Sequence, residues 1–164
     1  MHKMILIITV LFSGLIAGLL FSYSCSVNLG LHTLADVEYI KAMQSINKEI
    51  QNFYFFLVFI GLLLLFPLST WASYTANNKV VFYLFLCSAI FYFVGVFGIT
   101  IFGNVPLNNQ LAKINLSITS QETLSIFRNQ FEISWAKFHL IRTSASIISF
   151  LRAIIATSNL NQTL

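Results

Sequence analysis

Residues 80–102 read VVFYLFLCSAIFYFVGVFGITIF, and residues 103–109 read GNVPLNN. The first stretch has no charged residue and is long enough, as a helix, to cross the hydrocarbon core of a membrane, which takes about 20 residues. The second places two amide side chains, Asn104 and Asn108, on either side of Pro106 at the end of that helix. Because proline lacks a backbone N–H and disfavours helical geometry in the residue before it, we expect the chain to turn or kink here.

The rest of the chain shares this apolar character. It is 57% hydrophobic and 9% charged, whereas a soluble domain has about 25% charged residues to cover a water-facing surface. Long apolar runs without alternation are typical of transmembrane helices rather than of barrel strands. The first run exceeds the usual core of a signal peptide, so we expect it to be retained. The sequence predicts an all-α integral membrane four-helix bundle, a single domain over residues 1–164, with spans at about 4–23, 53–71, 80–102 and 138–156.

Two long connections join these spans, one over residues 27–52 and one between the third and fourth spans. Apolar residues recur every three or four positions in the first, which predicts an amphipathic helix over residues 37–51. A second amphipathic segment is expected at residues 107–114, and the last helix is expected to begin ahead of its span, within residues 124–137. With four spans, both long connections lie at the same end of the bundle, opposite the chain start, the short turn and the tail.

Polar side chains gather at the end that holds the long connections: Asn47, Asn104, Asn108, Trp135, His139 and Arg142. The last three are spaced i, i+4 and i+7 and so share one stripe of a helix. An ionisable residue within a span is costly and usually faces the bundle interior or water. One interpretation is a polar site at this end, with Asn47 as part of its substrate-binding wall. The other is that Arg142 extends to the membrane surface and that the asparagines only cap helix ends.

Several kinds of function have no support in the sequence. The nine Lys and Arg residues are scattered singly, so membrane lipids rather than nucleic acid are the expected partners. All five acidic residues lie in the long connections, and no Cys or His spacing suits zinc. There is no glycine-rich phosphate loop, and His139 is the only histidine inside a span, which leaves haem without a second ligand. We expect no metal, no cofactor, and a multi-pass location in a bacterial-type cytoplasmic membrane.

Short motifs occur in order along most of the chain: Ala42-Met43-Gln44-Ser45-Ile46-Asn47, Asn52-Phe53, Gly103-Asn104-Val105-Pro106-Leu107-Asn108 followed by Leu111, and Trp135 followed by Arg142-Thr143. Together these motifs resemble the paired signature of the anthrone oxygenase-like family of small four-span membrane proteins. The resemblance extends from about Leu11 to Leu151. It implies a four-helix membrane fold and, as in the characterised members, a cofactor-free oxygenase that converts polyketide anthrones to anthraquinones.

The resemblance also implies roles for the polar residues. An anthrone has an acidic C–H, and its anion reacts with oxygen directly, so the protein needs to bind a flat aromatic compound, remove a proton and stabilise the anion. His139 is the candidate base, since the ordinary pKa of histidine lies near neutrality. Arg142 would stabilise the enolate oxygen, with Asn104 and Asn108 as further donors. Trp135 would stack on the ring system.

Two alternatives need no catalysis. In the first, Arg142 bonds to carbonyl groups of the long connections and to the asparagine side chains, and so fixes both connections to the bundle. In the second, the same pocket binds a hydrophobic small molecule or a lipid without transforming it. An open apolar pocket favours an enzyme or a binding protein, whereas a filled end with every asparagine amide bonded to backbone favours the structural role.

Overall fold

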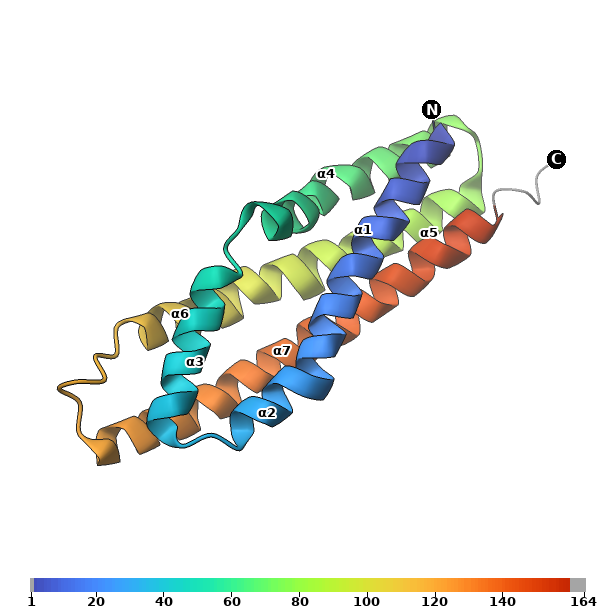
Figure 1. Ribbon diagram of the computed structural model, residues 1–164. Coiled ribbons are helices and arrows are strands. Elements are labelled where there is room, and N and C mark those ends of the chain that lie inside the picture. Colours follow the sequence, from blue (N-terminus) through green and yellow to red (C-terminus); the bar gives the residue numbers. More distant parts are fainter. Residues whose placement is uncertain (1, 160–164) are drawn as a thin grey trace.

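The computed structural model describes residues 2–159, and within this range the chain is helical and contains no strand. Four long helical rods pack side by side, and the start of the first, the turn between the second and third, and the end of the fourth lie at the same end (Figure 1). Each rod is long and apolar enough to cross a membrane: Lys3–His32, Phe53–Thr75, Lys79–Ala112 and Gln121–Ser158. The predicted all-α, four-span membrane bundle is therefore confirmed.

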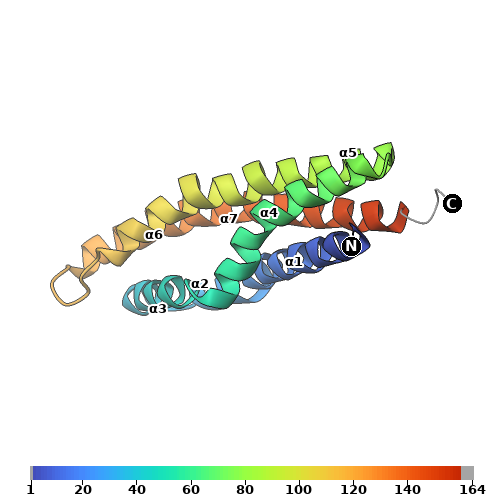
Figure 2. The same cartoon turned by 90° about the horizontal axis from the view of Figure 1, so that it is seen from above.

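The rods differ in how they are built. The first consists of α1 (His2–Ser22), the π-helical segment η1 (Tyr23–Val27) and α2 (Asn28–His32), and the second is α4 (Phe53–Thr75). The third consists of α5 (Lys79–Ile90), the π-helical segments η2 (Phe91–Gly98) and η3 (Thr100–Asn104), and α6 (Val105–Ala112); the fourth is α7 (Gln121–Ser158). Helix α1 packs against α4 and α7, and α5 packs against the same two helices, which closes the bundle (Figure 2).

The predicted amphipathic helix of the first connection is α3 (Asp36–Glu49). It contacts α6 and α7 and lies beside the bundle at the end that holds the long connections (Figure 1). Its buried residues, Tyr39, Ile40 and Met43, join a hydrophobic cluster with residues of α6 and α7, among them Leu111 and Trp135. Because one face of α3 is covered in this way, the helix forms part of the wall at this end of the bundle.

Of the turn or kink expected at Pro106, the turn is absent, since the third rod stays helical through this residue. Pro106 lies in the first turn of α6, directly after the π-helical segment η3. A change from i→i+5 to i→i+4 hydrogen bonding leaves a backbone group without its regular partner, so the missing N–H of a proline costs little at this point. The amphipathic segment predicted at residues 107–114 is accordingly the end of the third rod rather than a separate element.

The bundle core is apolar. Two helical segments approach closely within it, and hydrogen bonds from hydroxyl groups cross between helices. A Cβ added at Gly95 of η2 would lie 2.5 Å from the Cβ of Ala145, so η2 and α7 are packed as closely as glycine allows. The Tyr92 hydroxyl donates to the Phe59 carbonyl oxygen (2.7 Å), and the Ser149 hydroxyl donates to the Ser88 carbonyl oxygen (2.8 Å). These bonds join α4 to the third rod and the third rod to α7.

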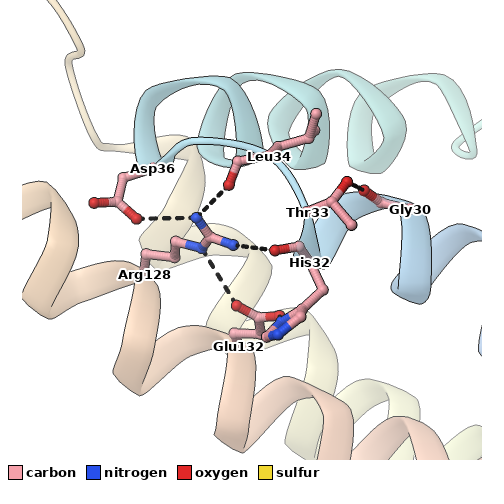
Figure 3. A network of polar contacts seen from close by, with 7 residues as sticks. All are labelled: Gly30, His32, Thr33, Leu34, Asp36, Arg128 and Glu132. Atoms are coloured by element: carbon pink, nitrogen blue, oxygen red, sulfur yellow. Dashed lines mark hydrogen bonds and ion pairs between the residues drawn. The ribbon is translucent and has the colours of Figure 1, made fainter.

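Arg128 joins the α2–α3 connection to α7 (Figure 3). Its guanidinium donates to the carbonyl oxygens of Leu34 (2.6 Å) and His32 (3.0 Å) and pairs with Asp36 (3.0 Å) and Glu132 (3.3 Å). The cation also lies 4.6 Å from the centre of the Tyr39 ring. Burial, and next the Glu132 carboxylate, raise the pKa of the Tyr39 hydroxyl, so this ring stays neutral beneath the cation.

Candidate functional site

A cavity of about 460 Å³ lies between the first rod, α3, the start of α4, the third rod and α7. Most of its walls are apolar and aromatic, including Tyr23, Phe55, Phe59 and Trp135. Three further apolar residues that line it lie within spans and are exposed at the protein surface: Leu19 (41%), Phe56 (42%) and Ile101 (39%). The rim of the cavity is therefore partly formed by lipid-facing side chains.

Trp135 is fixed in the cavity wall by the two asparagines around Pro106. Its indole Nε1–H donates to Asn108 Oδ1 at 2.8 Å, and its carbonyl oxygen accepts from Asn104 Nδ2 at 3.2 Å. The π-helical segment η3 places Asn104 toward α7, and α6 presents Asn108 one turn later. The motif around Pro106 therefore orients an aromatic ring of the cavity wall.

Arg142 lines the cavity and its contacts are neutral. Nε and one terminal nitrogen lie 3.2 and 3.1 Å from His139 Nδ1, and the other terminal nitrogen lies 3.5 Å from the Thr100 hydroxyl. The guanidinium carbon lies 5.2 Å from the centre of the Trp135 ring, within cation–π range. Within residues 2–159, Arg142 makes no ion pair with a carboxylate.

His139 lies behind this arginine, buried at 2% exposure, and does not line the cavity. Its ring stacks on Trp135, with centroids 4.9 Å apart and an interplanar angle of 13°. Because an arginine can only donate, Nδ1 accepts from Arg142, and we assign the proton of the neutral ring to Nε2. Nε2 then donates to the Ser24 hydroxyl (2.9 Å), which in turn donates to the Leu20 carbonyl oxygen (3.2 Å).

The two remaining predicted residues differ in their placement. Asn47 lines the cavity, and its Nδ2 is buried without a hydrogen-bond partner among the described residues. Asn104 is fully buried and does not line the cavity, and its Oδ1 likewise has no partner there. The structure therefore brings Asn47, Asn108, Trp135 and Arg142 to one cavity and leaves Asn104 and His139 behind its wall.

Arg142 does not fix the long connections in the way the structural alternative requires. Among residues 2–159 it bonds to neither asparagine near Pro106 and to no carbonyl of a connection. The asparagines bond to Trp135 instead. The carbonyl oxygens of the first connection accept from Arg128. That prediction for Arg142 is therefore wrong, because its side chain points to His139 and the cavity instead.

Some residues of the site could not have been selected from the sequence. Tyr23 lines the cavity from η1 and Thr100 from η3, while Ser24 completes the hydrogen bonds of His139. A tyrosine at the end of a predicted span suggests only a membrane-surface anchor, and single Ser and Thr residues in apolar helices are common. The shared signal is π-helical geometry, which often occurs at functional sites and is seen only in the structure.

A comparison with known protein families gives a match. Residues 55–152, more than half of the chain, match the family model described as anthrone oxygenase. No curated protein and no solved structure matches the chain. The matched region includes the Asn-Pro-Asn motif, Trp135 and Arg142, while the walls supplied by the first rod and α3 lie outside it.

Proposed function

Because this chain belongs to the anthrone oxygenase family, we propose that its cavity binds a hydrophobic aromatic compound of the anthrone class and that the protein oxidises it with O2 without a cofactor. The observation that carries the proposal is the apolar, aromatic cavity of about 460 Å³ with Arg142 on its wall. This volume lies in the usual range for small-molecule sites, about 300–1,000 Å³. Residues 1–164 act as one domain in this proposal, because all four rods and α3 contribute to the cavity.

The proposed reaction begins with loss of a proton from the ring methylene of the anthrone. The negative charge is delocalised onto the carbonyl oxygen, where the N–H groups of Arg142 stabilise it. The carbanion donates its electrons to O2 and forms a C–O bond, and a proton completes a hydroperoxide. Loss of water, with the second C–H proton, leaves a new carbonyl group. One anthrone and one O2 thus give one anthraquinone and one water.

His139 has a defined place in this scheme. In the resting protein, Nδ1 of His139 is occupied by the N–H groups of Arg142. In the proposal these groups turn to the substrate oxygen, which removes the donors from Nδ1 and also opens the wall in front of it, so that Nδ1 can reach and accept the methylene proton. Trp135, held by Asn108, supplies the aromatic surface against which the ring system stacks.

The test is oxygen uptake and quinone formation by the purified full-length protein with an added anthrone. Anthrones also oxidise slowly in air, so the heat-denatured protein gives the baseline. We expect His139→Ala to lower the rate above this baseline by about 10²-fold or more, the usual contribution of a positioned base. Arg152→Gln, near the far end of α7, is expected to keep the rate. A rate equal to that of the denatured protein contradicts the proposal.

A second candidate function is binding of a hydrophobic small molecule or lipid without chemistry. It is favoured by the resting state of His139, whose two ring nitrogens are both hydrogen-bonded. Mass spectrometry of the purified protein separates the candidates: an intact co-purifying compound together with no oxygen uptake supports binding alone. For both candidates we propose a bacterial-type cytoplasmic membrane as the location, since helical bundles are the usual architecture there.

A further inference from the structure

We infer that the cavity takes its aromatic ligand as an organic anion, a carboxylate or an acidic phenolate, with Arg142 as the counter-charge. The inference rests on the proposed function only in using the same cavity as the ligand site. It goes further in stating the charge that the ligand carries before any reaction. An anthrone bound in this way would bear an ionised acidic group of its own.

The first observation is that the charge of Arg142 is uncompensated. Its guanidinium contacts a neutral imidazole, a hydroxyl and an indole ring, supplied by His139, Thr100 and Trp135. Among residues 2–159, none that lines the cavity is acidic. His139 does not compensate the charge of Arg142, because its imidazole is neutral when Nδ1 is unprotonated and accepts from the arginine. This end of the cavity therefore carries one net positive charge.

The second observation is the contrast with Arg128, which lies on the same helix, α7. Arg128 serves a structural purpose and is paired with Asp36 and Glu132 as well as with backbone carbonyl groups. The chain thus supplies carboxylates where a shielded arginine only fixes a connection. Arg142 has no such partner among the described residues and instead faces a cavity large enough for a ligand.

The chemistry of the rest of the cavity defines the body of the ligand. Apart from the arginine, the walls are mainly aromatic and aliphatic, with the Trp135 indole held flat against His139. A cation in surroundings of low dielectric attracts an anion much more strongly than it does in water. A polycyclic aromatic ring with a carboxylate or phenolate at one edge therefore matches both the apolar walls and the unpaired charge.

Two probes that differ only in charge test the inference: anthracene-9-carboxylate and the neutral anthracene-9-carboxamide. Anthracene absorbs where tryptophan emits, so binding is measured by energy transfer from Trp135 in a full-length Trp71→Phe background, which leaves one tryptophan. Neither probe has the ring methylene that anthrone oxidation requires. Oxygen uptake tests the proposed function, and the difference in affinity between the two probes tests the charge of the ligand. Either result can be negative while the other is positive.

We expect the carboxylate to bind at least about tenfold more tightly than the amide, the usual scale of a hydrogen-bonded charge pair. Arg142→Gln is expected to abolish the preference, and Arg152→Gln to leave it intact. Equal affinities for the two probes in the Trp71→Phe protein overturn the inference, and this comparison does not depend on the folding of an Arg142 variant. Dodecanoate, an anion without rings, is expected to displace the anthracene carboxylate only weakly. If it displaces the probe as strongly as an aromatic carboxylate does, the inference that the ligand is aromatic is overturned.

Discussion

Two arginines of α7, Arg128 and Arg142, have different surroundings. Arg128 is shielded, with 12% of its side chain exposed, and joins the first connection to α7 through two carboxylates and two carbonyl oxygens. Arg142 contacts the cavity and neutral groups. The sequence drew attention to Arg142 because it lies inside an apolar run, whereas Arg128 lies among polar residues and gives no signal of its own.

We predict that Arg128→Lys destabilises the protein by about 2 kcal/mol, because lysine cannot serve all four acceptors that the planar guanidinium reaches. Thermal melting in detergent measures the change, with Arg152→Lys as the control. Arg142→Lys is expected to shift the melting temperature less than Arg128→Lys does. A larger shift for Arg142→Lys would mean that the cavity arginine holds the bundle together after all.

Asn47 combines a cost in stability with a place in the cavity. Its buried Nδ2 has no partner among the described residues, and such a group costs about 1–3 kcal/mol. Asn47→Leu keeps the approximate shape and removes the unpaired donor, so we predict a stability gain of about 1 kcal/mol together with weaker ligand binding. Asn129→Leu, an exposed position on α7, is the matched control and should change neither property. Lower stability of Asn47→Leu would show that this amide is satisfied in the protein.

At the scale of elements, the sequence predicted the helices that follow from apolar composition. It did not predict the π-helical segments, which depend on backbone hydrogen-bond geometry. The four spans and α3 follow from long apolar runs and from a three-to-four spacing. The rods extend beyond the predicted limits because helices continue through polar residues once neighbouring elements pack against them. The π-helical segments have no signature in composition, and the effect of Pro106 could not be judged without knowing that one of them precedes it.

The close packing of η2 on α7 gives a prediction at this scale. Gly95→Ala would place a methyl group 2.5 Å from the Ala145 Cβ, so the two elements must separate. Overpacking of this kind lowers the free energy of unfolding by about 1–3 kcal/mol. We therefore expect the variant to melt at a lower temperature than the wild type. The double variant Gly95→Ala with Ala145→Gly exchanges the small residues and should recover part of the loss. No recovery in the double variant would locate the damage elsewhere, for example in the π-helical backbone itself.

At the scale of the whole molecule, the site lies toward the end of the bundle that holds the long connections. Helix α7 has 38 residues, so it is about 57 Å long at 1.5 Å per residue, well beyond the roughly 30 Å hydrocarbon core. The excess at its N-terminal end carries Arg128 and supports α3. The sequence predicted that the polar residues gather at this end, but which of them reach the cavity depends on side-chain packing: His139 and Asn104 lie on the expected faces and are covered by Trp135 and its partners.

The two tryptophans test this placement in the membrane. Trp71 is 63% exposed on α4, near the end where the short turn lies, whereas Trp135 is 4% exposed in the cavity wall. In bilayers that contain brominated lipids, we predict strong quenching of Trp71 in the Trp135→Phe protein and weak quenching of Trp135 in the Trp71→Phe protein. Equal quenching of both would place Trp135 at the lipid-facing surface and contradict the packing described above.

For the hydrophobic ligand proposed above, the lipid-facing rim of the cavity, formed by Leu19, Phe56 and Ile101, determines how concentration must be counted. A hydrophobic compound that enters past these side chains comes from the bilayer, so its effective concentration is the number of molecules per lipid rather than per volume of water. Adding empty vesicles to a fixed amount of compound and protein should therefore lower occupancy, although the bulk concentration is unchanged. Affinities measured at different lipid or detergent contents become comparable only when expressed as mole fractions in the bilayer.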